Sequence, residues 1–188
     1  MLIGQASINL TANILSAALG LLGVFIFTRL FSPHEYGIYL LGIGFASVIS
    51  VFLVGWFRNL ILSEHARGDG DDVRGTVISG YLICCLAAPI AYGVGRLVGL
   101  EPAAALAAVG LSVAIGLFEL TQDLVRARLK ALSVMKATLV RAIAVLGLGA
   151  AVALVSPSGV LLLLSSALAY LLAVLAQSRT AWRGTVLK

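Results

Sequence analysis

FTRLFSPHEYG, residues 27–37, is the first stretch of this chain in which charged side chains occur. The 28 residues before Arg29 contain no Lys, Arg, Asp or Glu, and residues 36–57, which follow Glu35, are again uncharged. About 20 consecutive apolar residues in a helix are enough to cross the hydrocarbon core of a bilayer. Two such runs with a short polar break between them predict a pair of antiparallel transmembrane helices joined by this stretch.

The overall composition extends this prediction to the rest of the chain. Of the 188 residues, 61% are hydrophobic and 11% are charged, and the mean hydropathy is +1.08. A soluble domain carries about 25% charged residues, so this surface is not suited to water. We therefore predict an all-α, polytopic membrane protein in which residues 1–188 form one lobe of six transmembrane helices. The expected spans cover residues 8–28, 36–57, 76–95, 103–121, 138–155 and 160–178, and Pro89 is expected to kink the third.

The distribution of basic residues predicts the orientation of these spans. The net charge is +5, but the basic residues lie in the breaks between apolar runs, which favours a role as topology signals over a nucleic-acid surface. With the N-terminus inside, eleven of the thirteen Lys and Arg residues fall in cytoplasmic segments, and only Arg29 and Arg96 lie outside. This count includes residues 122–141, interpreted as a helical connection near anionic headgroups. Both termini are therefore expected in the cytoplasm.

The first two expected helices each carry a polar or small-residue face. Residues at steps of three or four share a face of a helix, as do Gln5, Asn9, Asn13, Ser16 and Gly20 in the first span. Amides are costly against lipid, so this face is expected to line a helix bundle or a wet cavity; interhelical hydrogen bonding without transport explains it equally well. In the second span, the corresponding face contains Gly44, Ser47, Val51, Gly55 and Arg58.

The candidate substrate-binding residues on these faces are Asn9, Asn13 and Arg58. Arg29 is a weaker candidate, because it lies about 160° around an ideal helix from Asn13. We expect the Arg29 side chain to extend to the lipid headgroups instead.

The fourth expected span carries the carboxylates nearest to the membrane interior. Its polar face contains Ser112, Gly116, Glu119, Asp123 and Arg126. Glu119, Asp123 and Arg126 follow one another at helical spacing, so they are candidates either for ion coupling or for a salt-bridged helix end.

No constellation in the sequence predicts an enzyme, a metal site or a cofactor site. Cys84 and Cys85 are adjacent in an apolar run without the spacing of metal ligands, and they are interpreted as packing residues. His34 and His65 fall on opposite sides of the predicted membrane, and no nucleophile–base arrangement occurs.

The hairpin sequence and two other stretches resemble a known family. TRLFSPHEYGIY, residues 28–39, resembles the R-L-x-S-P-x-E-Y-G-x-Y turn between the first two helices of bacterial polysaccharide flippases of the Wzx type. These flippases are members of the multidrug/oligosaccharidyl-lipid/polysaccharide transporter superfamily. GWFR, residues 55–58, is similar to that family's second-helix ending, and RAR, residues 126–128, is similar to its link between helices four and five. The chain thus resembles the N-terminal six-helix half of such a flippase.

The resemblance implies that the substrate is a polyprenyl-pyrophosphate-linked glycan, flipped across the bacterial cytoplasmic (inner) membrane by alternating access. Family members usually have two six-helix lobes, so this chain is expected to act as a half-length or truncated flippase, with membrane lipid and a homodimer or second-half subunit as partners. An arginine such as Arg58 suits a pyrophosphate, because guanidinium groups pair bidentately with phosphate oxygens.

Two other functions stay open. A cation-coupled multidrug exporter lobe would use Glu119 as its membrane carboxylate. A non-transporting membrane subunit or remnant would only pack against a partner.

Overall fold

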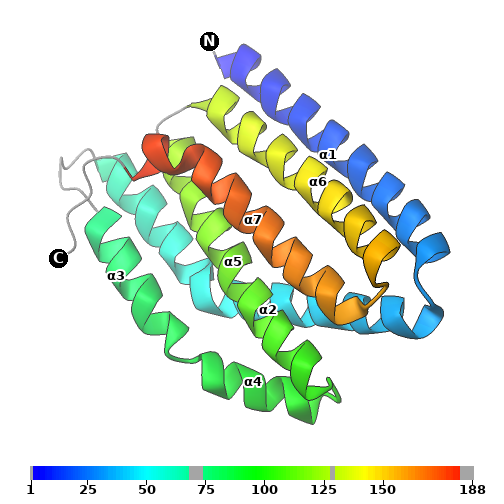
Figure 1. Cartoon of the computed structure of the whole chain (residues 1–188). Helices are drawn as coiled ribbons and strands as arrows, with labels where there is room; N and C mark the ends of the chain where they lie inside the picture. Colours follow the sequence, from blue (N-terminus) through cyan, green and yellow to red (C-terminus); the bar gives the residue numbers. More distant parts are fainter. Residues whose placement is uncertain (1, 68–73, 128–129, 183–188) are drawn as a thin grey trace.

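Seven helices make up nearly all of the chain that the structure describes (Figure 1). The structure is a computed structural model that describes residues 2–67, 74–127 and 130–182; within these ranges the side chains of residues 2–9, 58–60, 62–67 and 179–180 are not described. The helices are α1 (Leu2–Leu30), α2 (Pro33–Arg67), α3 (Arg74–Cys85), α4 (Ala88–Leu97), α5 (Pro102–Ala127), α6 (Ala131–Val155) and α7 (Gly159–Ala181).

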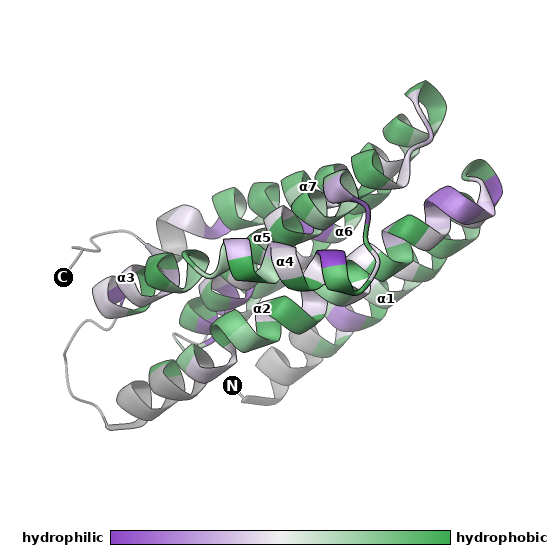
Figure 2. Ribbon diagram, turned by 90° about the horizontal axis from the view of Figure 1, so that it is seen from below, coloured by the Kyte–Doolittle hydropathy of each residue, from purple (hydrophilic) through white to green (hydrophobic). Residues whose placement is uncertain are grey.

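Five of the helices are membrane-length, and one bent pair has the combined length and composition of a sixth span. In the described residues, α1, α2, α5, α6 and α7 are each long and apolar enough to cross a membrane, and α3 and α4 pass the same test only together, as a broken span or a re-entrant loop. Hydrophobic residues cover most of the ribbon (Figure 2). The prediction of an all-α, polytopic membrane protein is confirmed, and every expected span lies within one helix or, for the third, within the α3–α4 pair.

The kink expected at Pro89 is also confirmed. The axes of α3 and α4 differ by 45°, and Pro89 occupies the first turn of α4. Proline has no backbone N–H, so the carbonyl of Cys85 cannot accept the helical hydrogen bond that another residue at this position would donate. The first turn of a helix is where this loss is tolerated, and the chain therefore breaks just before Pro89.

The hairpin that begins the fold also positions the last helix. The turn between α1 and α2 ends with Ser32, whose Oγ accepts a hydrogen bond of 3.3 Å from the backbone N–H of Glu35, as at a helix N-terminus. The Glu35 carboxylate in turn accepts a hydrogen bond of 2.6 Å from the backbone N–H of Gly159, the first residue of α7. The two turns approach so closely that a Cβ on Gly159 would overlap the backbone carbonyl of Glu35. We call this end of the bundle the hairpin end.

α5 is the central helix of the bundle. It packs against α2 on one side and against α7 on the other, and α6 packs against both α7 and α1 (Figure 1). Close approach of helices needs small side chains, and α5 provides Ala104, Ala107, Ala108, Ser112, Ala114 and Gly116 as buried residues. α1 packs along α6 but has few contacts with α2, so a space lies between α1 and α2.

The basic stretch at residues 122–141 differs from the prediction of a separate connecting segment. α5 continues to Ala127 and α6 begins at Ala131, and residues 122–141 contain neither Gly nor Pro. Arg141 therefore lies inside a membrane-length helix. It does not belong in the count of cytoplasmic loop charges, of which ten remain, so the bias that predicts the orientation persists.

Candidate anion-binding site

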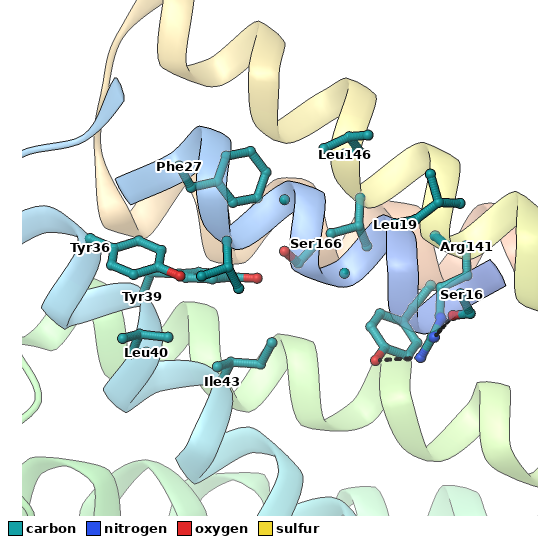
Figure 3. Close-up of a pocket in the computed structure, with 16 residues that line it drawn as sticks. Ser16, Leu19, Phe27, Tyr36, Tyr39, Leu40, Ile43, Arg141, Leu146 and Ser166 are labelled. Atoms are coloured by element: carbon teal, nitrogen blue, oxygen red, sulfur yellow. Dashed lines mark hydrogen bonds between the residues drawn. The ribbon is translucent and has the colours of Figure 1, made fainter. Parts of the chain in front are cut away.

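Arg141 lines a cavity of about 270 Å³ between α1, α2, α6 and α7 (Figure 3). We call this cavity the Arg141 pocket. Most of its lining is aliphatic or aromatic, and its polar side chains are Ser16, Tyr36, Tyr39, Arg141, Ser166 and Tyr170. Ligand sites are commonly apolar cavities that contain a few convergent polar groups.

The position of Arg141 along α6 places its charge deep in the bundle. Arg141 is ten residues beyond Ala131 and fourteen before Val155, which is about 15 Å and about 21 Å along the helix axis. Ser16 in α1 and Tyr170 in α7 are also near the middle of their helices. The half-buried Arg141 therefore lies near the middle of α6, well away from either end of the helix.

Neutral groups from three other helices hold the guanidinium. Arg141 Nη2 donates a hydrogen bond of 3.0 Å to Ser16 Oγ, and Nη1 donates one of 3.2 Å to the Tyr170 hydroxyl. The guanidinium carbon is 5.3 Å from the ring centroid of Tyr170 and 5.6 Å from that of Phe118, within the range of cation–π interaction. The Tyr170 and Phe118 rings meet edge to face at 5.4 Å, which fixes their orientation.

Arg141 has no negatively charged partner in the described part of the chain. A charged residue at the centre of a transmembrane helix costs about 3 kcal/mol on the insertion scale. A guanidinium carries five N–H donors, and two of them are engaged by the bonds to Ser16 and Tyr170. The arrangement presents an uncompensated positive charge with free donors in a largely apolar cavity, so it is suited to binding an anion.

The other end of the Arg141 pocket is uncharged and aromatic. Tyr36 and Tyr39 lie there with ring centroids 5.9 Å apart, and Phe27 contacts Tyr39 edge to face at 6.5 Å. Figure 3 shows this group at the opposite end of the cavity from Arg141 and Ser16. Arg141 is the only charged side chain among the described residues that line the pocket.

A second cavity, of about 370 Å³, lies between α2 and α5. It contains three of the polar residues predicted on the fourth span, Glu119, Asp123 and Arg126, together with Gln122. Arg126 and Asp123 form an ion pair at 3.4 Å, and the Arg126 side chain is 48% exposed. Opposite them lie Val51 and Gly55, from the small-residue face predicted for the second span. The structure thus brings these two predicted faces together, and the Asp123–Arg126 pair has the form of a salt-bridged helix end.

The other predicted site residues are not brought together. Asn13 is exposed on α1 and lines neither cavity, although Ser16 and Gly20 from the same stripe line the Arg141 pocket. Arg29 is exposed at the hairpin end, with its guanidinium carbon 4.3 Å from the Phe25 ring centroid. The side chains of Asn9 and Arg58 lie outside the described residues, so their predicted roles stay predictions.

Sequence reasoning missed Arg141 as a site residue because it was counted with the basic connection. One signal could have identified it, since Arg141 falls inside the expected span 138–155, where a charge is costly. The partners Ser16 and Tyr170 are 125 and 29 residues away in sequence, and no local pattern predicts those contacts.

Comparisons with protein-family models, with curated proteins and with solved structures found no match for this chain. What can be stated of its class follows from the structure itself. It is a multi-pass, all-α membrane protein with a cationic cavity inside its helix bundle.

Proposed function

We propose that this chain translocates a polyprenyl-pyrophosphate-linked oligosaccharide across the bacterial cytoplasmic membrane during synthesis of a cell-surface polysaccharide such as O-antigen or exopolysaccharide. In this proposal the chain acts as one lobe of a flippase, with a second copy or another subunit as the other lobe. The hairpin end faces the outside, and both termini are in the cytoplasm.

The observation that carries the proposal is the guanidinium of Arg141, which lies near the middle of α6 and has no carboxylate partner among the described residues. A lipid-linked substrate passes through the membrane with its negatively charged pyrophosphate, which requires a cation at mid-depth. Arginine suits this role because its planar fork of N–H groups matches phosphate oxygens and its charge does not depend on pH. The apolar lining of the pocket and the space between α1 and α2 are compatible with a ligand that carries a hydrocarbon chain.

The direct test is binding of a polyprenyl pyrophosphate by the purified chain in nanodiscs. Hydrogen bonds to charged groups contribute about 1.5–3 kcal/mol, so Arg141→Ala is expected to weaken binding by about 10- to 150-fold. Arg141→Lys keeps the charge but loses the bidentate geometry, and it is expected to restore binding in part.

Arg29→Ala is the matched control, because it removes the same charge from an exposed position outside the pocket. Complementation of a flippase-deficient strain should follow the same order as binding. Equal affinity of wild type and Arg141→Ala would refute the role of Arg141 in substrate binding.

A second candidate function is supported by the carboxylates in the cavity between α2 and α5. Glu119 and Asp123 there would suit a cation-coupled multidrug exporter lobe. Binding of a cationic dye that Glu119→Gln abolishes and that a polyprenyl pyrophosphate does not compete would favour this function.

A further inference from the structure

The Arg141 pocket has two chemically different ends. On α1, Ser16 marks the charged end and Phe27 the aromatic end, and the eleven helical steps from one to the other correspond to about 16 Å of helix. A single phosphoryl group held by Arg141 therefore leaves the aromatic end of the cavity free for the rest of the ligand.

The aromatic end carries hydroxyl groups on a rigid frame. Tyr39 is 7% exposed and packs against Phe27, and Ser166 lines the same cavity. Tyr36 is half-buried, and its hydroxyl has no hydrogen-bond partner in the described part of the chain. Tyr36 thus offers both a ring and a free hydroxyl, and its ring packs against that of Tyr39.

The side chains at the aromatic end of the pocket disfavour a second phosphoryl group and a hydrocarbon chain, and they favour a neutral polyhydroxylated ring. A second phosphoryl group would need a cation, and none of the described residues at this end carries a positive charge. A hydrocarbon chain would leave the Tyr36 hydroxyl without a partner, which is unfavourable. A neutral polyhydroxylated ring satisfies both features, since its hydroxyls pair with the tyrosine hydroxyl and its C–H face packs on the tyrosine ring.

We propose that the aromatic end of the Arg141 pocket is a sugar-binding subsite, in which Tyr36 contacts the neutral sugar attached to the phosphoryl group that Arg141 holds. This inference rests on the proposed function and adds to it a residue that selects for the glycan. Because Tyr36 is in the first turns of α2, the sugar lies towards the hairpin end and the phosphoryl group lies deeper.

The test compares two ligands with the full chain in nanodiscs. One is a short-chain polyprenyl pyrophosphate, and the other is the same lipid carrying one neutral hexose on the pyrophosphate. The wild type is expected to bind the glycosylated lipid at least fivefold more tightly. Tyr36→Leu is expected to reduce this ratio to about one while changing the affinity for the bare pyrophosphate by less than twofold. Tyr36→Phe keeps the ring and is expected to retain part of the ratio.

The control is Tyr92→Phe and Tyr92→Leu on α4, where a half-buried tyrosine near the same end of the bundle lies outside the pocket. Tyrosines also occur at membrane interfaces as anchors, and an anchor would alter stability without altering the ratio of the two affinities. A wild-type ratio of one, or an equal loss of the ratio in the Tyr92 variants, would overturn the sugar subsite.

Two further outcomes separate this inference from the proposed function. If Arg141→Ala does not weaken binding of the bare pyrophosphate, the proposed function fails whatever the ratio. If phosphatidylglycerol nanodiscs suppress binding of both ligands equally relative to phosphatidylcholine nanodiscs, Arg141 recognises anionic headgroups in general and the proposed function fails, whereas the unchanged ratio still supports the sugar subsite.

Discussion

Replacing Glu35 tests whether its contact with Gly159 joins the α1–α2 turn to the start of α7. Glu35 lies in the first turn of α2, and its carboxylate accepts a 2.6 Å hydrogen bond from the backbone N–H of Gly159, 124 residues later. The first N–H groups of a helix have no partner within the helix, and the N-terminus carries a partial positive charge. A carboxylate at this point therefore satisfies a donor and interacts favourably with the helix dipole of α7.

The expected loss of stability follows from the hydrogen bond to Gly159 and from the interaction of the carboxylate charge with the dipole of α7. Loss of a side-chain cap costs about 1 kcal/mol, and a charge at a partly buried helix N-terminus contributes up to about 2 kcal/mol. Glu35→Ala is therefore expected to lower the free energy of unfolding by about 2 kcal/mol. Glu35→Gln can still accept the hydrogen bond but lacks the charge, so it is expected to cost about half as much.

Unfolding of the purified chain in mixed micelles with increasing SDS measures this difference. His34→Ala is the control, because His34 is the exposed neighbour of Glu35 in the same turn of α2. The reasoning is refuted if Glu35→Ala unfolds at the same SDS fraction as His34→Ala. Equal losses for Glu35→Ala and Glu35→Gln would show that the hydrogen bond contributes little and the charge nearly everything.

Three other substitutions probe the site and the packing. Arg58→Ala is expected to abolish complementation of a flippase-deficient strain at unchanged protein level, because the sequence predicts Arg58 on the small-residue face of the second span. Complementation at the wild-type level would contradict its predicted role in substrate binding. Gly159→Ala is expected to cost about 1–3 kcal/mol in SDS unfolding, since its methyl group would overlap the Glu35 carbonyl, and unchanged stability would contradict the close approach of the two turns. Tyr81→Phe removes the hydrogen bond from the buried Tyr81 hydroxyl to the Val113 carbonyl, and it should cost about 1 kcal/mol more than Tyr92→Phe; an equal loss would argue against this link between α3 and α5.

The membrane spans could be predicted because their signal is local. Length and hydropathy identify each span, and Pro89 marks the break in the third, where a missing backbone N–H must interrupt a helix. The boundaries near residues 122–141 were harder to place. Charged residues there suggested a helical connection near the headgroups, but α5 continues to Ala127 and α6 already begins at Ala131, because Lys and Arg are good helix formers and do not end a helix.

The candidate site was less predictable, because contacts between distant segments decide it. The stripe on the first span did identify Ser16, whose Oγ accepts a hydrogen bond from Arg141, but Asn13 from the same stripe is exposed. A stripe along one helix spans several turns, whereas the pocket contacts only the part of α1 that faces α6 and α7. Periodicity therefore predicts which residues share a face of a helix, but it does not predict which of these residues contact a neighbouring helix.

Arginine has two roles in this chain, as a topology signal near helix ends and as a pocket residue inside α6, and position along the helix distinguishes them. The positive-inside rule concerns charges near helix ends, where a guanidinium reaches water or headgroups at little cost. Arg141 is about ten residues deeper than such a position and rests on the neutral oxygens of Ser16 and Tyr170. Those two bonds do not neutralise its charge, and the described residues provide no carboxylate that does. Arg141 thus combines a position well inside a membrane-length helix, where a charge is costly, with neutral partners among the described residues, and the proposal of an anionic ligand rests on this combination.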